Sequence, residues 1–308
     1  MSSRATPRGA LPSRAALATA LLGGLLTLAL PTAGAAVTTS TAVAATGTPT
    51  TTGVTTTVAA TSVVTTSVVT TAAAPATAGL VVTKRGTAFA GAAQVRQVGT
   101  SVQGRRIMAY GYGDPAASRV VVVIGQLHGS ETAGVPVAKR LAALGARAGT
   151  FVWVIPTANP DGFKARTRGN AHGVDLNRNG SDRWSPVARA ARYWPGPAAM
   201  SEPETQATYA FLDQIDPDLV LIYHQAGNGI DSYRAKNRAV VDRLSRLTRL
   251  PVRSFDCAGE CTGTLTGWFN SSHRGIAITV ELPARVGAAQ VDRWARSVRN
   301  ISRTVPDV

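Results

Sequence analysis

Residues 120–144 read VVVVIGQLHGSETAGVPVAKRLAAL and predict a strand, a turn and a helix. The uninterrupted Val/Ile run is typical of a strand that is buried on both faces of a parallel sheet. His128 and Glu131 lie in the turn, at the carboxyl end of that strand, where open α/β sheets bind ligands. The two side chains could therefore bind one metal ion. Taken alone, however, the pair is better explained by a solvated turn whose glutamate favours a helix N-terminus.

On both sides of this stretch, apolar runs alternate with amphipathic segments. Strands are predicted at residues 107–112, 150–156, 218–223 and 276–280, and helices at residues 201–215, 234–247 and 288–298, with a shorter one within 262–272. This alternation predicts an α/β fold, a single domain at residues 84–308 with a mixed, mostly parallel central sheet flanked by helices. Residues 159–185 are rich in Gly and Asn without periodicity, which is typical of a functional loop.

The first 83 residues predict export. Residues 1–35 contain three arginines, a short apolar run and the small residues Ala-Gly-Ala, which is the order of a secretory signal peptide. The run is short for a transmembrane span, although an uncleaved anchor is the alternative. Residues 36–83 are rich in Thr, Val and Ala and predict a disordered linker that could carry O-linked glycans, with a strand-forming or self-associating role as the alternative. We expect a secreted protein, extracellular or cell-wall associated, without a transmembrane span after signal cleavage.

The net charge predicts the kind of partner that the protein binds, and the two cysteines predict a disulfide. The formal net charge is +15, and loss of Arg4, Arg8 and Arg14 with the signal peptide would leave +12. Such a protein is expected to associate electrostatically with anionic cell-wall polymers, whereas no motif predicts nucleic-acid binding. Cys257 and Cys261 predict one disulfide in an oxidising compartment. The alternative, a zinc site built on C-x-x-x-C, lacks a second cysteine pair.

Three polar residues are expected to leave three strands at the same edge of the sheet. They are His128, His224 and Glu281, and Glu131 joins them from the first turn. Two imidazoles and one carboxylate with an open fourth position form a catalytic zinc site, beside which a second carboxylate can act as a base. Singly, each residue has an ordinary explanation, such as a strand-end histidine bonded to a carbonyl. Together, they favour one site.

The order of motifs resembles the zinc carboxypeptidase (metallocarboxypeptidase) family. The shared features are H-x-x-E at 128–131, N-P-D-G at 159–162, G-V-D-L-N-R-N at 173–179, a strand-end histidine and a strand-end glutamate. The resemblance runs from about Gly99 to the C-terminus and implies the family's fold. Within the family the chain is most similar to bacterial murein peptide amidases, through R-x-N-x-x-G-V-D-L-N-R-N, S-E-P-E-T-Q-A at 201–207 and residues 263–268 before T-V-E-L-P. Those enzymes cut the γ-D-glutamyl–diaminopimelate bond of cell-wall peptides.

The resemblance also implies a role for each matching residue. It assigns one Zn²⁺ per domain to His128, Glu131 and His224, the general base to Glu281, oxyanion stabilisation to Arg168, and the substrate carboxylate to Asn177 and Arg178. A planar guanidinium suits a carboxylate, and a fixed cation suits a developing oxyanion. A generally Arg-rich surface is the alternative for these arginines.

Three further residues are given no direct role in catalysis or metal binding. Asp175 is expected to orient a loop or a ligand histidine. His172 and His273 lie outside the motifs and are expected to be exposed.

One region departs from the family pattern. The family's best-known members carry a tyrosine that closes over the substrate, whereas residues 254–263 contain none. They contain Asp256, Glu260 and the two cysteines instead. An acidic, disulfide-braced loop could contact the ammonium of a diaminopimelate-like side chain, or it could be a surface hairpin that the disulfide stabilises.

The sequence thus predicts an exported, monomeric, zinc-dependent metallopeptidase. Its expected reaction is hydrolysis of an amide bond next to a free carboxylate, in cell-wall peptides or in ordinary peptides as a carboxypeptidase. A zinc-dependent deacylase of small N-acyl amino acids is one alternative, because related enzymes with that activity share H-x-x-E and the later histidine. A non-catalytic cell-wall-binding relative is the other.

Overall fold

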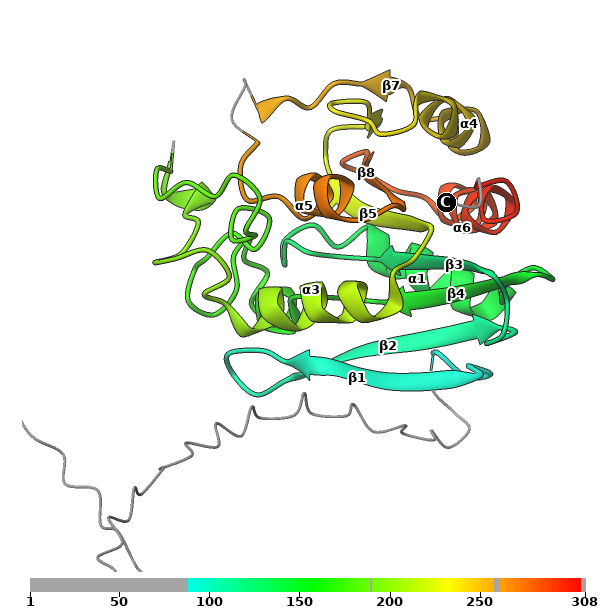
Figure 1. The fold of residues 1–308 in the computed structure, drawn as a ribbon, viewed down its shortest axis with the longest axis horizontal. Coiled ribbons are helices and arrows are strands. Elements are labelled where there is room, and N and C mark those ends of the chain that lie inside the picture. The colour runs from blue at the N-terminus through cyan, green and yellow to red at the C-terminus, as the bar shows by residue number, and fades with distance from the viewer. Residues whose placement is uncertain (1–87, 189, 258–260, 306–308) are drawn as a thin grey trace, which may run out of the picture. The chain divides into compact units, whose positions relative to one another are not determined.

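The computed structural model describes residues 88–188, 190–257 and 261–305 of the chain. The expected signal peptide (1–35) and linker (36–83) lie outside these described residues. The described part forms one eight-stranded sheet in the order β1-β2-β4-β3-β5-β8-β6-β7 (Figure 1). Its strands are β1 (Gln94–Thr100), β2 (Arg106–Gly113), β3 (Arg119–Ile124), β4 (Thr150–Ile155), β5 (Leu219–Gln225), β6 (Gly229–Asp231), β7 (Val252–Arg253) and β8 (Ile276–Leu282).

The sheet is mixed, as expected. The central strands β4, β3, β5 and β8 pair in parallel, whereas β1, β2 and β4 pair antiparallel and β6 pairs antiparallel with β8. The helices are α1 (Gly134–Leu144), α2 (Pro160–Ala165), α3 (Pro203–Ile215), α4 (Arg238–Thr248), α5 (Leu265–Ser272) and α6 (Ala288–Ile301), with a 3-10 turn η1 (Ala191–Tyr193). The predicted α/β fold, a mixed sheet flanked by helices, is confirmed.

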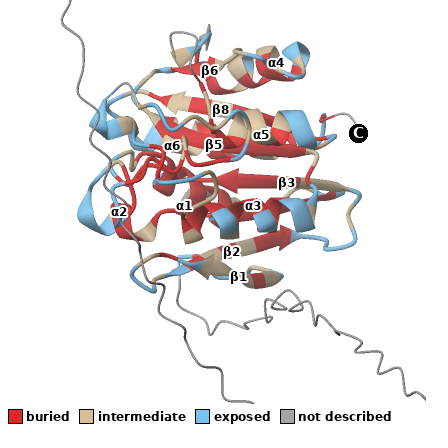
Figure 2. Cartoon of the chain, turned by 60° about the vertical axis from the view of Figure 1, so that its left-hand side comes forward, coloured by how far each residue is buried: buried red, intermediate tan, exposed pale blue. Residues whose placement is uncertain are grey.

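Helices cover both faces of the sheet. On β3, Val121 and Val123 pack in a cluster that includes buried residues of α1, α4 and α6, whereas Val122 and Ile124 pack in a cluster with α3 and α5. Figure 2 shows the central strands buried and the outer helix surfaces exposed. Burying each such side chain contributes about 1.5–3 kcal/mol, and burial on both faces explains why β3 is apolar from Val120 to Ile124.

Short elements differ from the prediction. The segment that begins with N-P-D-G was interpreted as a loop from its first residue, but it opens with helix α2. Asn159 caps this helix by accepting a hydrogen bond from the Gly162 N–H (2.8 Å), and Pro160 occupies its first position. Strands β6 and β7 were not predicted, because three and two residues are too few to show a period. Helix α4 begins four residues later than predicted, because Asn237 caps it.

The described residues include no helix that is both long and apolar enough to cross a membrane.

Candidate active site

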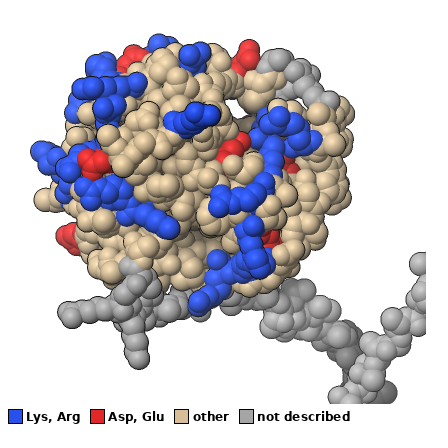
Figure 3. Space-filling view, turned by 180° about the vertical axis from the view of Figure 1, so that it is seen from behind, with Lys and Arg blue, Asp and Glu red and all other residues tan. Residues whose placement is uncertain are grey.

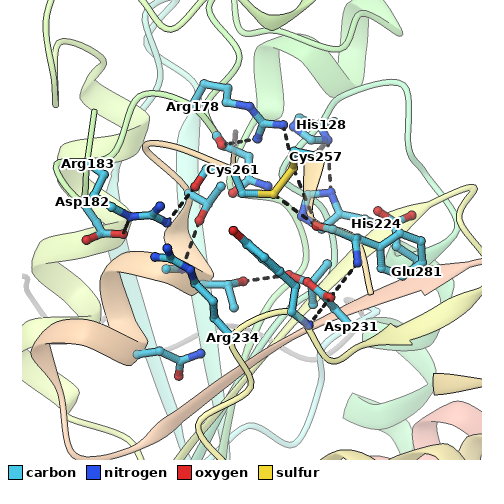
Figure 4. A pocket seen from close by; sticks show the side chains of 18 of the residues that line it. His128, Arg178, Asp182, Arg183, His224, Asp231, Arg234, Cys257, Cys261 and Glu281 are labelled. Carbon is cyan, nitrogen blue, oxygen red and sulfur yellow. Dashed lines mark hydrogen bonds and ion pairs between the residues drawn. A yellow bond between two sulfur atoms is a disulfide. The ribbon is translucent and has the colours of Figure 1, made fainter. Parts of the chain in front are cut away.

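The sheet brings the predicted site residues to one cavity. In the parallel pairing of β5 with β8, His224 lies directly beside Glu281. His128 lies in the loop after β3, the neighbour of β5 on the other side. All three line a cavity of about 350 Å³, together with Glu131 and Arg178 (Figure 4).

Three ligand atoms converge at the head of this cavity. Nδ1 of His128 lies 3.0 Å from Oε2 of Glu131, and Nδ1 of His224 lies 2.9 Å from the same oxygen. The two Nδ1 atoms are 3.1 Å apart. Ligands at the usual zinc distances of about 2.0–2.1 Å in a tetrahedron lie about 3.3 Å from one another, so the triangle is close to that spacing. The cluster could therefore bind a metal ion, and its two nitrogens and one oxygen suit zinc.

The charge of the cluster also suits a cation. Burial opposes ionisation of Glu131, but hydrogen bonds with both histidines outweigh burial and hold the pKa of its carboxyl far below the ordinary value. Glu131 would thus offer an anionic oxygen to a cation at neutral pH. The remote nitrogen of His224, Nε2, is buried and has no hydrogen-bond partner among the described residues.

Asp175 contacts the ring nitrogen of His128 that does not face Glu131. Its Oδ1 lies 2.8 Å from Nε2 of His128, and its Oδ2 accepts a hydrogen bond from Nε of Arg168 at 2.9 Å. Burial opposes the charge of Asp175, but His128 and then Arg168 outweigh burial and hold its pKa well below the ordinary value. The expectation that Asp175 orients a ligand histidine agrees with this contact.

Close backbone packing fixes the turn between the two N-terminal ligands. A Cβ on Gly129 would lie 1.9 Å from the carbonyl carbon of Gly162 and 2.4 Å from the carbonyl oxygen of Thr167. A Cβ on Gly162 would lie 2.4 Å from the oxygen of Gly169. Three segments therefore meet without side chains between them, which gives the N-P-D-G motif a structural reason that its turn sequence alone did not reveal.

Arg168 lies beside the cluster. Its Nη1 donates to Oε1 of Glu131 at 2.9 Å, and its guanidinium lies 5.1 Å from the ring centre of Tyr193. Its side chain is 17% exposed and lines the cavity, so a bound substrate can reach it. Tyr193 was not singled out in the sequence, because it follows an irregular segment without any motif.

Asn177 and Arg178 line the same cavity. Arg178 donates from Nη1 to the backbone oxygen of Asn177 (2.7 Å), and its Nη2 lies 3.5 Å from Sγ of Cys257. Burial lowers the pKa of the Arg178 guanidinium below its ordinary value. A cation that burial destabilises in this way would be stabilised by an anion, such as a carboxylate, in the cavity.

Glu281 reaches the cavity from β8. Its Oε2 accepts a hydrogen bond from the Gly227 N–H at 3.0 Å, which holds the carboxylate in place. The other carboxylate oxygen has no hydrogen-bond partner among the described residues. The structure thus brings together all seven residues that the sequence assigned to the site, while their individual roles stay predictions.

Besides Glu131 and Glu281, the cavity lining includes two acids that the sequence analysis did not single out, Asp182 and Asp231. Asp256 is exposed and is absent from the cavity lining, and Glu260 lies outside the described residues. Asp231 of β6 lines the cavity instead, and its Oδ1 accepts hydrogen bonds from the N–H groups of Tyr233 (2.8 Å) and Phe255 (3.1 Å). Burial raises the pKa of Asp231 above its ordinary value. Only the position of β6 beside β8 reveals this acid.

The predicted disulfide between Cys257 and Cys261 is present. It is more than a surface staple, because both cysteines line the cavity and Cys257 also lines a neighbouring cavity of about 410 Å³ that shares Arg178. Figure 4 shows the disulfide at the cavity, next to Arg178.

The two remaining histidines differ in how far their side chains are exposed. His172 is exposed, as expected, and pairs with Glu202 at 2.7 Å. The expectation for His273 is wrong, since only 8% of its side chain is exposed. Its ring stacks on that of Phe269 with centroids 4.3 Å apart, so aromatic packing against α5 buries it.

Comparisons with known proteins agree with this geometry. The model of the zinc carboxypeptidase family matches residues 83–285. Murein peptide amidase A of Escherichia coli K12 is 28% identical over 165 residues, which are 50% of this chain and 66% of that enzyme. The chain therefore spans about two thirds of the length of that curated relative.

Solved structures share the fold. Murein-tripeptide amidase from Escherichia coli O157 superimposes with a TM-score of 0.54 at 24% identity, covering 69% of this chain and 92% of that one. Carboxypeptidase A from Helicoverpa armigera gives a TM-score of 0.60 at 18% identity, covering 70% of this chain and 69% of that one. At these identities the likeness shows the architecture alone.

Proposed function

The chain belongs to the zinc carboxypeptidase family, and from that premise we propose that it hydrolyses an amide bond next to a free carboxylate in cell-wall peptides. The proposed bond is the γ-D-glutamyl–diaminopimelate bond. The observation that carries the proposal is one cavity that holds both the His128–Glu131–His224 triangle and the partly buried cation of Arg178. The similarity to murein peptide amidase A supports the choice of substrate.

The proposed mechanism uses the contacts of this chain. Zinc bound by His128, Glu131 and His224 would polarise the amide carbonyl and lower the pKa of water. Glu281 has one oxygen held by the Gly227 N–H and one left to accept the proton of the attacking water, which it then passes to the leaving amine. Both transfers need the carboxylate to stay in one orientation, and the backbone hydrogen bond provides that restraint.

Two arginines are proposed to bind the negatively charged oxygens of the substrate. Arg168 lies beside Glu131, where a fixed cation stabilises negative charge that develops on the carbonyl oxygen. Arg178, with Asn177 beside it, holds the free carboxylate of the substrate, because a planar guanidinium can bond both carboxylate oxygens. The distance between the two arginine sites then decides which amide bond reaches Glu281.

We further propose that the protein is exported and monomeric, with a signal peptide at 1–35, a linker at 36–83 and the peptidase domain at 84–308. The basic region, apolar run and Ala-Gly-Ala of the first segment support export. The face shown in Figure 3 carries many Lys and Arg side chains and few acids, which supports electrostatic association with anionic cell-wall polymers.

The test uses the full chain, loaded with zinc, against defined muropeptides and ordinary peptides, with products weighed by mass spectrometry. We expect cleavage between glutamate and diaminopimelate, and none by Glu281→Gln at equal zinc content. Release of C-terminal residues from ordinary peptides alone would replace the amidase assignment with carboxypeptidase, and hydrolysis only of small N-acyl amino acids would replace it with deacylase. No release by zinc-loaded wild type would favour a non-catalytic wall-binding protein.

A further inference from the structure

The cavity contains a carboxylate that the proposed mechanism does not use. Strand β6 pairs antiparallel with β8, with Gly229 opposite Glu281 and Ile230 opposite Val280. Residues directly opposite each other on antiparallel strands point to the same face of a sheet, and alternate residues share a face. Asp231 is therefore on the face that carries Glu281, and both side chains line the cavity.

Asp231 is held in place but not neutralised. The N–H groups of Tyr233 and Phe255 both donate to its Oδ1. Its Oδ2 accepts no hydrogen bond from the described residues, and no arginine or lysine among them pairs with Asp231. A fixed carboxylate with one oxygen left over is a binding group for a cation or an N–H donor.

Charged groups of both signs line the cavity, and two of them lie apart from each other. Figure 4 shows Arg178 near His128 at the top of the view, and Asp231 lower down, on the side of Glu281. The lining also includes Arg234, Asp182 and Arg183, and the cavity volume of about 350 Å³ is that of a small-molecule site. A ligand that reaches from Arg178 to Asp231 would place a carboxylate at the arginine and an ammonium at the aspartate.

We propose that Asp231 binds the side-chain ammonium of the residue whose free carboxylate is held by Arg178. The cavity would then select a residue with a second amino group, of the diaminopimelate or lysine type, over a neutral residue of the same length. The preference between substrates rests on the amide hydrolysis proposed above. Binding of a free amino acid by Arg178 and Asp231 does not depend on hydrolysis.

The test compares two substrates that differ only in the ammonium, one with lysine and one with norleucine on the carboxylate side of the cleaved bond. We expect wild type to prefer lysine in kcat/KM, and Asp231→Asn to reduce that preference about 10–100-fold through the lysine substrate alone, as expected for a lost charge-assisted hydrogen bond. The asparagine Oδ1 still accepts both backbone N–H groups, so the variant should fold, which circular dichroism checks. Asp256→Asn is the matched control, an exposed acid outside the cavity lining, and should keep the wild-type preference.

A binding measurement separates the two proposals. Calorimetry with free lysine and free norleucine should show a preference for lysine in wild type that Asp231→Asn loses. If wild type shows this binding preference but cleaves no substrate, the proposed hydrolysis is contradicted, while the role of Asp231 in binding the ammonium is supported. An unchanged lysine preference in Asp231→Asn, in either measurement, or a loss in Asp256→Asn instead, would overturn the inference.

Discussion

Nε2 of His128 lies 2.8 Å from Oδ1 of Asp175, and both side chains are almost completely buried. Since Nδ1 of the same ring faces Glu131 and His224, the contact with Asp175 determines how the ring is presented to a metal ion. An imidazole that donates its other N–H to a carboxylate is a more basic and better oriented ligand.

Asp175→Asn should therefore weaken zinc binding about 10–100-fold, because the amide cannot carry the charge that fixes the imidazole. Competition with a chelator measures the affinity. Asp242→Asn, which removes an exposed acid paired with Arg238 on α4, is the control and should bind zinc normally. Equal affinities in both variants would argue against the orienting role of Asp175.

Removal of zinc should abolish turnover and lower the melting temperature. Two nitrogens and an anionic oxygen lie about 3 Å apart in this cluster, and a bound cation would stabilise all three. At 100 times its Kd, bound zinc contributes about 2.7 kcal/mol to the free energy of unfolding. Thermal unfolding with chelator and with added zinc measures the shift, which His224→Ala should lose. A melting temperature that does not respond to zinc would count against the site.

Arg178→Lys should lower kcat/KM about 10–100-fold for substrates with a free carboxylate, because an ammonium cannot form the two parallel hydrogen bonds of a guanidinium. Substrates whose carboxylate is replaced by an amide should be cleaved slowly by both forms. Steady-state kinetics on the matched pair is the measurement, with Arg246→Lys on the exposed face of α4 as control. An equal loss on both substrates would place Arg178 in folding rather than in carboxylate binding.

Asp161→Asn should destabilise the fold in a pH-dependent way. Asp161 accepts hydrogen bonds from Ser101 Oγ (2.8 Å) and Gln103 N (2.9 Å) and pairs with Arg105. Burial opposes its charge, but the Gln103 N–H, Arg105 and Ser101 outweigh burial and lower the pKa below the ordinary 3.8. Because the folded-state pKa is the lower one, this stabilisation is present above about pH 4 and is lost as the pH falls through the folded value.

The difference in unfolding free energy between wild type and Asp161→Asn should thus be roughly 1–3 kcal/mol at pH 7 and shrink towards pH 3. Denaturant titrations at the two pH values measure it. A difference that is the same at both would show that charge plays no part.

Gly129→Ala should lower both stability and zinc affinity, because its Cβ would overlap the backbone of Gly162 and move the turn between His128 and Glu131. Gly287→Ala is the matched control, since a Cβ there meets only the side chain of Gln290, at 3.7 Å. Metal analysis and thermal unfolding of the two variants provide the comparison. Normal zinc content in Gly129→Ala would mean that the turn tolerates the shift.

The central architecture could be predicted because its signals are local. A strand buried on both faces needs apolar residues at every position, so β3 and β5 stand out in the sequence. His128 and Glu131 were found by their spacing, and His224 and Glu281 by their place after apolar runs.

The elements that the sequence did not reveal depend on distant partners. Strand β6 has three residues and exists because β8 pairs with it, so Asp231 becomes a cavity residue only through that register. His273 is buried because Phe269 stacks on it, and no residue pattern near His273 announces this contact. Asp256 was one of two acids that the sequence placed near the substrate as one of two alternatives, but it is exposed and does not line the cavity.

The contact of Gly129 with Gly162, and of Gly162 with Gly169, has a consequence for protein engineering. The turn that contains His128 and Glu131 packs directly against α2 and the segment around Arg168. Without those two segments, the turn would not keep its conformation in another scaffold. A designer who grafts this metal centre must transplant all three segments together, and random libraries should leave these glycines unvaried even where they search the neighbouring residues.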